Sequence, residues 1–223
     1  GNTTYNTVNT LNNSGNYVDI HGIQFGAMCG SYLNTAKVPE FIYYPFKLST
    51  LEEAKVNTYL AVKYGVTLRG IDYTATDGTI VWNRTTNATY NNRIFGIGRE
   101  LATGGLNQKQ SQSRMQPSGN LSNNFLKIAK GALATTNNAN TGVLADGDYL
   151  LIGDNNGAMS SQTTEIPVSI SGGGCTYGRL TREWKVAVTG APGAITLVAG
   201  SNDAGSFKFS GSMAGIQVLI DED

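Results

Sequence analysis

The sequence is poor in charge, histidine and long apolar runs, and each shortage excludes a class of function. Charged residues make up 14% of the 223 residues, and 16 basic side chains balance 16 acidic ones. Such a chain has no basic footprint for nucleic acid or for an anionic membrane surface. His21 is the single histidine and no Cys-x-x-Cys pair occurs, which argues against zinc. No run approaches the roughly 18 apolar residues that a membrane-spanning helix needs.

The same shortages weigh against catalysis. A Ser-His-Asp or Cys-His arrangement would have to use His21, which lies in a strand-like run, and the chain has no nucleophile elbow. A glycoside hydrolase needs only two carboxylates, and the sequence does not single out a pair from Glu40, Glu100, Glu165 and Glu183. We therefore expect a protein that is not an enzyme.

Cysteine is also scarce, with two residues in similar glycine-rich surroundings, Cys29 and Cys175. A disulfide between them would join the two halves of the chain and would stabilise the fold by roughly 5 kcal/mol on the chain-entropy model. The alternative is a pair of small buried thiols.

The abundant residues are glycine, asparagine, threonine and serine, which favour short strands joined by tight turns. Asp77-Gly78 between apolar runs predicts a hairpin. The spacing of the later strand-like runs predicts an all-β fold, an antiparallel β-sandwich of jelly-roll type. These runs are 93–100, 124–130, 149–153, 165–170, 180–188, 194–199, 207–209 and 216–220.

One segment reads as a helix, over about residues 50–64. Ser49 and Glu52 form a capping-box pattern at its start, and Gly65 supplies a left-handed end. Its apolar residues fall on two sides, since Val56, Leu60 and Tyr64 lie opposite the main apolar face. The helix therefore either lies on one sheet with some exposed apolar residues or is wedged between two β layers.

The run 180–188 alternates so that Arg182 and Trp184 share one face. If that face is buried, Arg182 needs a carboxylate partner, for which we expect Glu100 or Asp154. The alternative places Arg182 at the rim of the sheet, with its charge in solvent. Glycines 96 and 98 on one strand face predict close packing of a bulky neighbour, Trp82 or Trp184.

Carboxylate-rich turns suggest calcium, which takes six to eight oxygen ligands. The preferred pair is Asp154 and Asn156, and their Asp-Asn-Asn-Gly sequence is equally typical of a plain turn. Similar short acidic segments occur at 146–148 and 221–223.

Several motifs carry a resemblance to known families. Residues 40–65, with Glu40-Phe41-Ile42-Tyr43-Tyr44 and Tyr59-Leu60-Ala61-Val62-Lys63-Tyr64-Gly65, resemble the end of a LamG-like, concanavalin-type jelly roll. Gly96-Ile97-Gly98-Arg99-Glu100, Leu106-Asn107-Gln108-Lys109-Gln110-Ser111 and Arg182-Glu183-Trp184 resemble the domain that follows it in large secreted surface proteins of Bacteroidota-type bacteria. The resemblance implies three parts: strands of the jelly roll at 1–47, ending with a strand at 38–46, a junction helix at 48–68, and a β-sandwich domain at 69–223.

Three functions follow from these observations. The first is a non-catalytic structural or adhesive module of an extracellular, cell-surface protein, and it implies neighbouring domains or other copies of the chain as partners. The second is a carbohydrate-binding module for surface glycans, with aromatic residues stacked on sugar rings. The third is a glycan-active enzyme. The aromatic candidates are Tyr43, Tyr44, Trp82, Tyr90 and Tyr177. We also expect the chain to be a segment of a longer protein or a processed subunit, with open sheet edges that neighbours complete.

Overall fold

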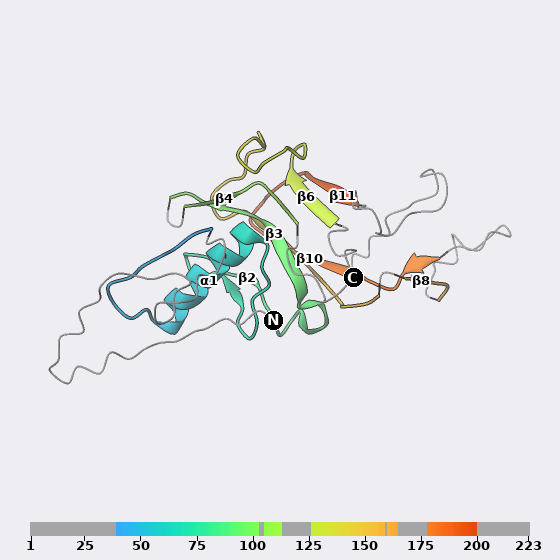
Figure 1. Ribbon diagram of the computed structural model, residues 1–223, viewed down its shortest axis with the longest axis horizontal. Coiled ribbons are helices and arrows are strands. Elements are labelled where there is room, and N and C mark those ends of the chain that lie inside the picture. The colour runs from blue at the N-terminus through green and yellow to red at the C-terminus, as the bar shows by residue number, and fades with distance from the viewer. Residues whose placement is uncertain (1–38, 103–104, 113–125, 159, 165–177, 200–223) are drawn as a thin grey trace, which may run out of the picture. The chain divides into compact units, whose positions relative to one another are not determined.

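The structure is a computed structural model that describes residues 39–102, 105–112, 126–158, 160–164 and 178–199. The chain divides into two compact units, Gly1–Pro45 and Phe46–Asp223. The helix therefore belongs to the same unit as the strands that follow it. This second unit contains every helix and strand described below (Figure 1).

The predicted helix is confirmed as α1, Thr50–Tyr64. Its capping box is complete, because the Ser49 amide donates to Glu52 Oε2 at 2.7 Å and the Glu52 amide donates to Ser49 Oγ at 3.3 Å. Gly65 ends the helix with a φ of 63°, and the Val66 amide then donates to the Ala61 carbonyl at 3.0 Å. Both ends of α1 are thus fixed by its own sequence.

A four-stranded antiparallel sheet forms the centre of the unit, in the order β10-β7-β3-β4. Its strands are β10 (Trp184–Thr189), β7 (Tyr149–Asp154), β3 (Asn92–Glu100) and β4 (Leu106–Gln108). β7 is buried along its whole length, and β3 is buried over nearly all of it. A mostly apolar strand buried on both faces requires a covering layer on each side of the sheet.

One face of the central sheet is covered by α1 and by a hairpin of β1 (Tyr73–Thr74) and β2 (Ile80–Trp82). Asp77 and Gly78 form the turn, as predicted, and Gly78 has a φ of 96°. A short 3₁₀ helix, η1 (Ala88–Tyr90), leads from this hairpin into β3. The first core lies between the central sheet and this covering layer. Its buried residues include Val62, Tyr73, Trp82, Ile94, Tyr149 and Leu151.

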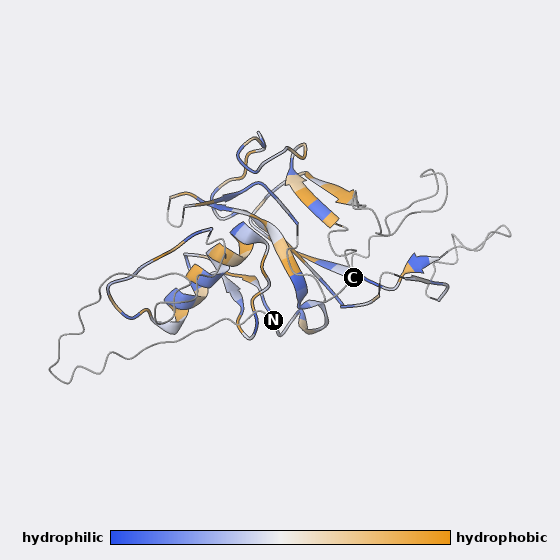
Figure 2. Ribbon diagram, in the orientation of Figure 1, coloured by the Kyte–Doolittle hydropathy of each residue, from blue (hydrophilic) through white to orange (hydrophobic). Residues whose placement is uncertain are grey.

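The other face is covered by a three-stranded sheet in the order β11-β6-β5. These strands are β11 (Ile195–Ala199), β6 (Leu126–Lys130) and β5 (Gln110–Gln112). A second core lies between the two sheets and includes Phe95, Ile97, Leu126, Ile128, Leu150 and Ile152. Apolar residues are conspicuous on β3, β6 and β11 in Figure 2. The predicted all-β sandwich with one helix is therefore confirmed.

Two expected strands differ from the structure. Residues 39–46 form no strand, and the prolines at 39 and 45 explain why, since proline cannot donate to a strand ladder. The run 180–188 is interrupted at 181–183, where β9 (Arg179–Leu180) pairs with β8 (Ser161–Gln162) before β10 begins. The other strands expected in 1–38, 165–170, 207–209 and 216–220 lie outside the described residues.

Glycines in the central sheet allow close packing, but not of the residues expected. A Cβ on Gly96 would lie 2.4 Å from the Leu150 carbonyl oxygen, and a Cβ on Gly98 would lie 2.4 Å from the Tyr149 ring. Tyr149 and Leu151, rather than a tryptophan, fill this space. Trp82 instead packs on Gly153, where a Cβ would lie 2.8 Å from the indole ring. The tryptophan prediction was wrong because cross-strand neighbours are set by strand register.

A polar corner connects the two sheets where β4 passes into β5 with only Lys109 between them. The Asn137 side chain accepts from the Lys109 amide at 2.6 Å and donates to the Asn107 carbonyl at 2.7 Å. The Gln110 side chain exchanges two hydrogen bonds with the backbone of Ala134, at 2.8 and 2.9 Å. Asn140, which is 2% exposed, donates to Gln110 and to the Ala132 carbonyl. These carboxamides hold the loop 131–142 against the corner.

Tyr149 provides a test of the first core. Its ring is 1% exposed, and its hydroxyl has no hydrogen-bond partner within the described part of the chain. Burial raises the pKa of Tyr149 well above its ordinary value, and the nearby Glu100 carboxylate raises this pKa further, although the hydroxyl and this carboxylate do not meet the geometry of a hydrogen bond. Because an unsatisfied buried hydroxyl is costly, we expect Tyr149→Phe to leave the free energy of unfolding unchanged or to raise it by about 1 kcal/mol. Urea unfolding followed by circular dichroism measures this, and a loss above about 1 kcal/mol would reveal a hydrogen bond from the hydroxyl.

Among the described residues, no helix is both long enough and apolar enough to cross a bilayer.

Candidate functional site

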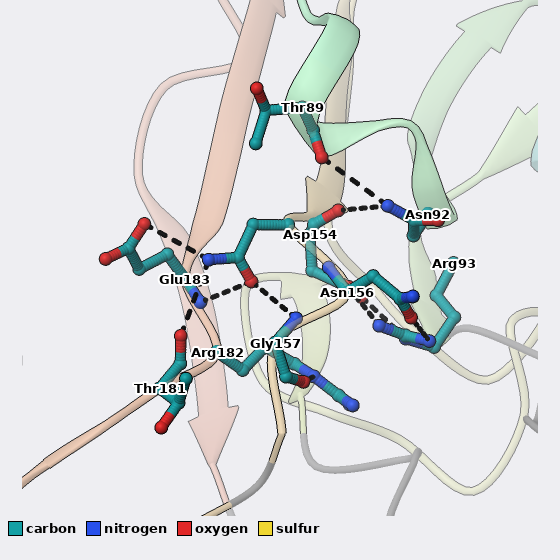
Figure 3. Close-up of polar contacts among 10 residues, drawn as sticks. Thr89, Asn92, Arg93, Asp154, Asn156, Gly157, Thr181, Arg182 and Glu183 are labelled. Carbon is teal, nitrogen blue, oxygen red and sulfur yellow. Dashed lines mark hydrogen bonds and ion pairs between the residues drawn. The ribbon is translucent and has the colours of Figure 1, made fainter. Parts of the chain in front are cut away.

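The densest group of buried charge lies where β3 begins beside the end of β7. Arg93 Nε donates to Asp154 Oδ2 at 2.7 Å, and Arg93 Nη2 pairs with Asp154 Oδ1 (Figure 3). Arg93 Nη1 donates to Asn156 Oδ1 at 2.9 Å. Arg93 and Asp154 are 8% and 2% exposed. We refer to Arg93, Asp154, Asn156 and the neighbouring Arg182 as the arginine cluster.

Backbone geometry aims Arg93 at its partner. Asn92 pairs with Asp154 across the sheet, and the register shifts between Asn92 and Phe95, so the strand bulges at Arg93. Arg93 has a φ of 47°, in the left-handed region that a non-glycine residue adopts at a cost. The Asn92 side chain also donates to the Asp154 carbonyl at 3.0 Å. The bulge thus turns a charged side chain toward Asp154 at the point where the strand starts.

Arg182 lies beside this pair, on the connection from β9 to β10. Its residue is 8% exposed, and its Nε donates to the Gly157 carbonyl at 2.8 Å. Burial lowers the pKa of the Arg182 guanidinium, the nearby Arg93 lowers this pKa further, and Asp154 opposes both effects. The cluster therefore holds two guanidinium groups close to one carboxylate.

A second layer of hydrogen bonds ties the cluster to β10. The Asn155 amide donates to the Glu183 carbonyl at 3.1 Å, and the Glu183 amide donates to Asn155 Oδ1 at 3.1 Å. Asn155 Nδ2 also donates to Glu183 Oε2 at 3.2 Å, and Arg179 pairs with Glu183 at 2.9 Å. Gly157 fits closely in this arrangement, since a Cβ there would lie 2.6 Å from the Thr181 carbonyl. The side chains therefore join β3, β7 and the start of β10.

The structure corrects the partner expected for Arg182. Of the two alternatives for Arg182, the structure shows the buried one. Asp154 lies near Arg182, but Asp154 forms its ion pair with Arg93. Glu100 lies at the far end of β3, about 25 Å from Asn92 at roughly 3.3 Å per residue. There Glu100 Oε1 accepts from the Thr76 amide at 2.8 Å and from Thr76 Oγ1 at 2.9 Å. Glu100 is therefore not the partner of Arg182.

The side-chain oxygen atoms proposed as calcium ligands accept hydrogen bonds from protein groups instead. Asp154 and Asn156 do lie together, as the calcium prediction requires, but the cation between them is the Arg93 guanidinium. Asp146 accepts from Arg99 Nε at 2.9 Å, and Asp148 accepts from the amides of Ala145 and Ala191. No group of three or more acidic, histidine or cysteine residues in the described ranges could hold a metal ion. These side chains fit a guanidinium and loop amides better than they fit Ca²⁺.

The remaining predicted residues are scattered. Trp184 packs at the edge of the second core, and Trp82 is fully buried with its Nε1 donating to Asn91 at 2.9 Å. Tyr43 and Tyr44 are 65% and 39% exposed. Cys29, Cys175 and Tyr177 lie outside the described residues, so the disulfide stays a prediction. Burial removes Trp82 from the aromatic residues that could stack on a sugar.

Sequence reasoning overlooked Arg93, which is the centre of the cluster. A signal for it existed: Arg93 stands at the head of an otherwise apolar strand, Arg93-Ile94-Phe95-Gly96-Ile97, and a charge entering a buried strand needs a partner. The sequence could not name that partner, because Asp154 is 61 residues away.

Fold and site together define an all-β sandwich domain with one covering helix, whose buried charges join its strands. The chain belongs to the family described as a domain of unknown function (DUF8202), whose family model matches residues 52–222. That match begins within α1 and covers the strands of both sheets. No curated protein and no solved structure matches the chain.

Proposed function

We propose that this chain is a non-catalytic structural module of a secreted bacterial surface protein, joined to neighbouring domains or to other copies of itself. The observation that carries the proposal is the arginine cluster. Its three charged groups, Arg93, Asp154 and Arg182, are all buried, and they face one another and the backbone rather than an open site. They act as a cross-link between strands.

Two of the four carboxylates that could have formed a hydrolase pair, Glu100 and Glu183, support the same proposal. Glu100 bonds with Thr76, and Glu183 bonds with Arg179 and Asn155. The two residues lie at opposite ends of the central sheet, because Glu100 ends β3 whereas Glu183 precedes β10 beside Asp154. The separation far exceeds the roughly 5–10 Å that glycoside hydrolysis requires.

Carbohydrate binding is the second candidate, and one observation favours it. Phe41 and Tyr43 are each at least half exposed and lie two residues apart in the first unit, and exposed aromatic rings can stack on sugars. Phe41 and Tyr43 lie in the sequence between prolines 39 and 45, in a segment that forms no strand.

A glycan array probed with the full chain separates the two candidates. A structural module should show no binding above background. Binding that Tyr43→Ala/Tyr44→Ala abolishes, and that the exposed but non-aromatic control Val143→Ala retains, would establish the carbohydrate-binding alternative. Product analysis after incubation with mixed polysaccharides tests the enzyme reading, and released oligosaccharides would refute a non-catalytic role.

A further inference from the structure

Arg182 is a buried cation whose guanidinium is only partly satisfied by the described residues. The residue is 8% exposed, and its Nε donates to the Gly157 carbonyl at 2.8 Å (Figure 3). The same guanidinium carries N–H donors on Nη1 and Nη2, and these have no acceptor in the described part of the chain. The two groups lie in one plane and form a fork that suits an anion. Buried donors on a charged group favour a charged acceptor.

Asp154 does not supply that acceptor, because its carboxylate is engaged by Arg93. Asp154 Oδ2 accepts from Arg93 Nε at 2.7 Å, and Asp154 Oδ1 pairs with Arg93 Nη2. Asp154 Oδ1 also accepts from the Asn156 amide at 2.8 Å. The negative charge of Asp154 is therefore matched by Arg93, and Arg182 lacks a counter-charge of its own.

The charges around Arg182 do not cancel. Arg93 and Asp154 form one ion pair, and Arg179 and Glu183 form a second, with 2.9 Å between Arg179 Nη1 and Glu183 Oε1. Arg182 adds a positive charge to these two neutral pairs. Burial lowers the pKa of Arg182, the neighbouring Arg93 lowers this pKa further, and Asp154 opposes both effects. The cluster thus has a net excess of one buried positive charge.

We infer that Arg182 binds a small monovalent anion, such as chloride or formate, through its Nη1 and Nη2 groups. A single negative charge balances the excess, whereas sulfate or doubly charged phosphate would leave the buried cluster with a net negative charge. The anion must be small, because Arg182 is 8% exposed and a bulky acid could not reach its guanidinium. The bound ion completes the cross-link between the strands.

The surroundings of Arg182 provide a route for exchange with solvent. Gly157, whose carbonyl binds Arg182, is partly exposed, and the residues on either side of it, Asn156 and Ala158, are exposed. An anion can therefore reach the cluster from this turn without unfolding of the sheet. Such an anion site goes beyond the proposed structural role and does not depend on it.

Thermal unfolding of the full chain in different sodium salts tests the site. The protein is first exchanged into sodium HEPES, whose anion is too bulky to enter, and formate or chloride then replaces HEPES at constant ionic strength. We expect the melting temperature to rise by several degrees and to saturate, because a ligand that binds only the native state stabilises it. The anion that saturates at the lower concentration is the preferred ligand.

Two variants show whether Arg182 is responsible. Arg182→Met removes the excess charge and should abolish the rise. Arg99→Met is the matched control, because Arg99 forms a partly exposed ion pair with Asp146, and it should retain the rise. An equal rise in wild type and Arg182→Met would overturn the proposal. So would the absence of a rise with either anion, which is the result expected if a carboxylate of the chain already binds Arg182.

Chloride NMR on the wild type gives a second measurement that does not depend on how well Arg182→Met folds. Binding to the protein should broaden the chloride line, and formate should sharpen it again by competing for the same site. A chloride line width that the protein leaves unchanged, or that formate does not reverse, would overturn the shared anion site.

Discussion

Replacing Asp154 with asparagine is expected to lower the free energy of unfolding by about 3–5 kcal/mol, because it leaves the buried Arg93 guanidinium without a counter-charge. At about 2–4 °C per kcal/mol for a chain of this size, the melting temperature should fall by roughly 10 °C. Thermal unfolding followed by circular dichroism measures the shift. The effect is large because the neighbouring Arg182 adds a second positive charge.

Two variants show whether unpaired charge is the cause. Asp146→Asn removes the partly exposed ion pair with Arg99, in which the Arg99 and Asp146 side chains are 29% and 42% exposed. This variant should shift the melting temperature far less. Arg93→Met/Asp154→Leu removes both charges and should be more stable than Asp154→Asn alone. If Asp154→Asn and Asp146→Asn lower the melting temperature equally, the Arg93–Asp154 pair does not stabilise the fold as argued.

Trp82→Ala is expected to cost about 3–5 kcal/mol, since it opens a cavity at the largest fully buried side chain. The indole fits only because Gly153 has no side chain, and its Nε1 donates to Asn91 at 2.9 Å. Urea unfolding followed by circular dichroism gives the change in the free energy of unfolding. Trp82→Phe should cost less, because the phenyl ring retains most of the buried surface and loses mainly the hydrogen bond.

Ile80→Ala is the matched control on the same strand. Ile80 is 48% exposed, so its truncation should change the free energy of unfolding by less than about 1 kcal/mol. A comparable cost for Ile80→Ala and Trp82→Ala would contradict the placement of Trp82 at the centre of the first core.

Local signals in the sequence predicted the elements well. The Ser49–Glu52 capping box and Gly65 predicted α1 to the residue, and Asp77-Gly78 predicted the hairpin. β7 and β11 begin and end within one residue of their expected ranges. Each of these features depends on neighbours within about five positions, where propensity and turn chemistry decide the conformation.

The site was harder to predict because it depends on register. Arg93 meets Asp154 only after β3 and β7 have paired with a bulge at Arg93, and one residue of slip would turn the side chain to the other face. The same uncertainty made tryptophan the expected neighbour of Gly98 when Tyr149 is the actual one. The Asp154–Asn156 proximity was predictable from the turn, but the cation that it binds was not.

The corner between β4 and β5 has a consequence for the conditions in which the domain can work. Its hydrogen bonds come from Asn137, Asn140 and Gln110, which carry no charge, and Lys109 is the one ionised member. Bonds between neutral amides are not screened by salt, and carboxamides have no proton to gain or lose between acidic and alkaline water. The contact that keeps the two sheets together on this side should thus hold equally at low and at high salt concentration and over a wide range of pH.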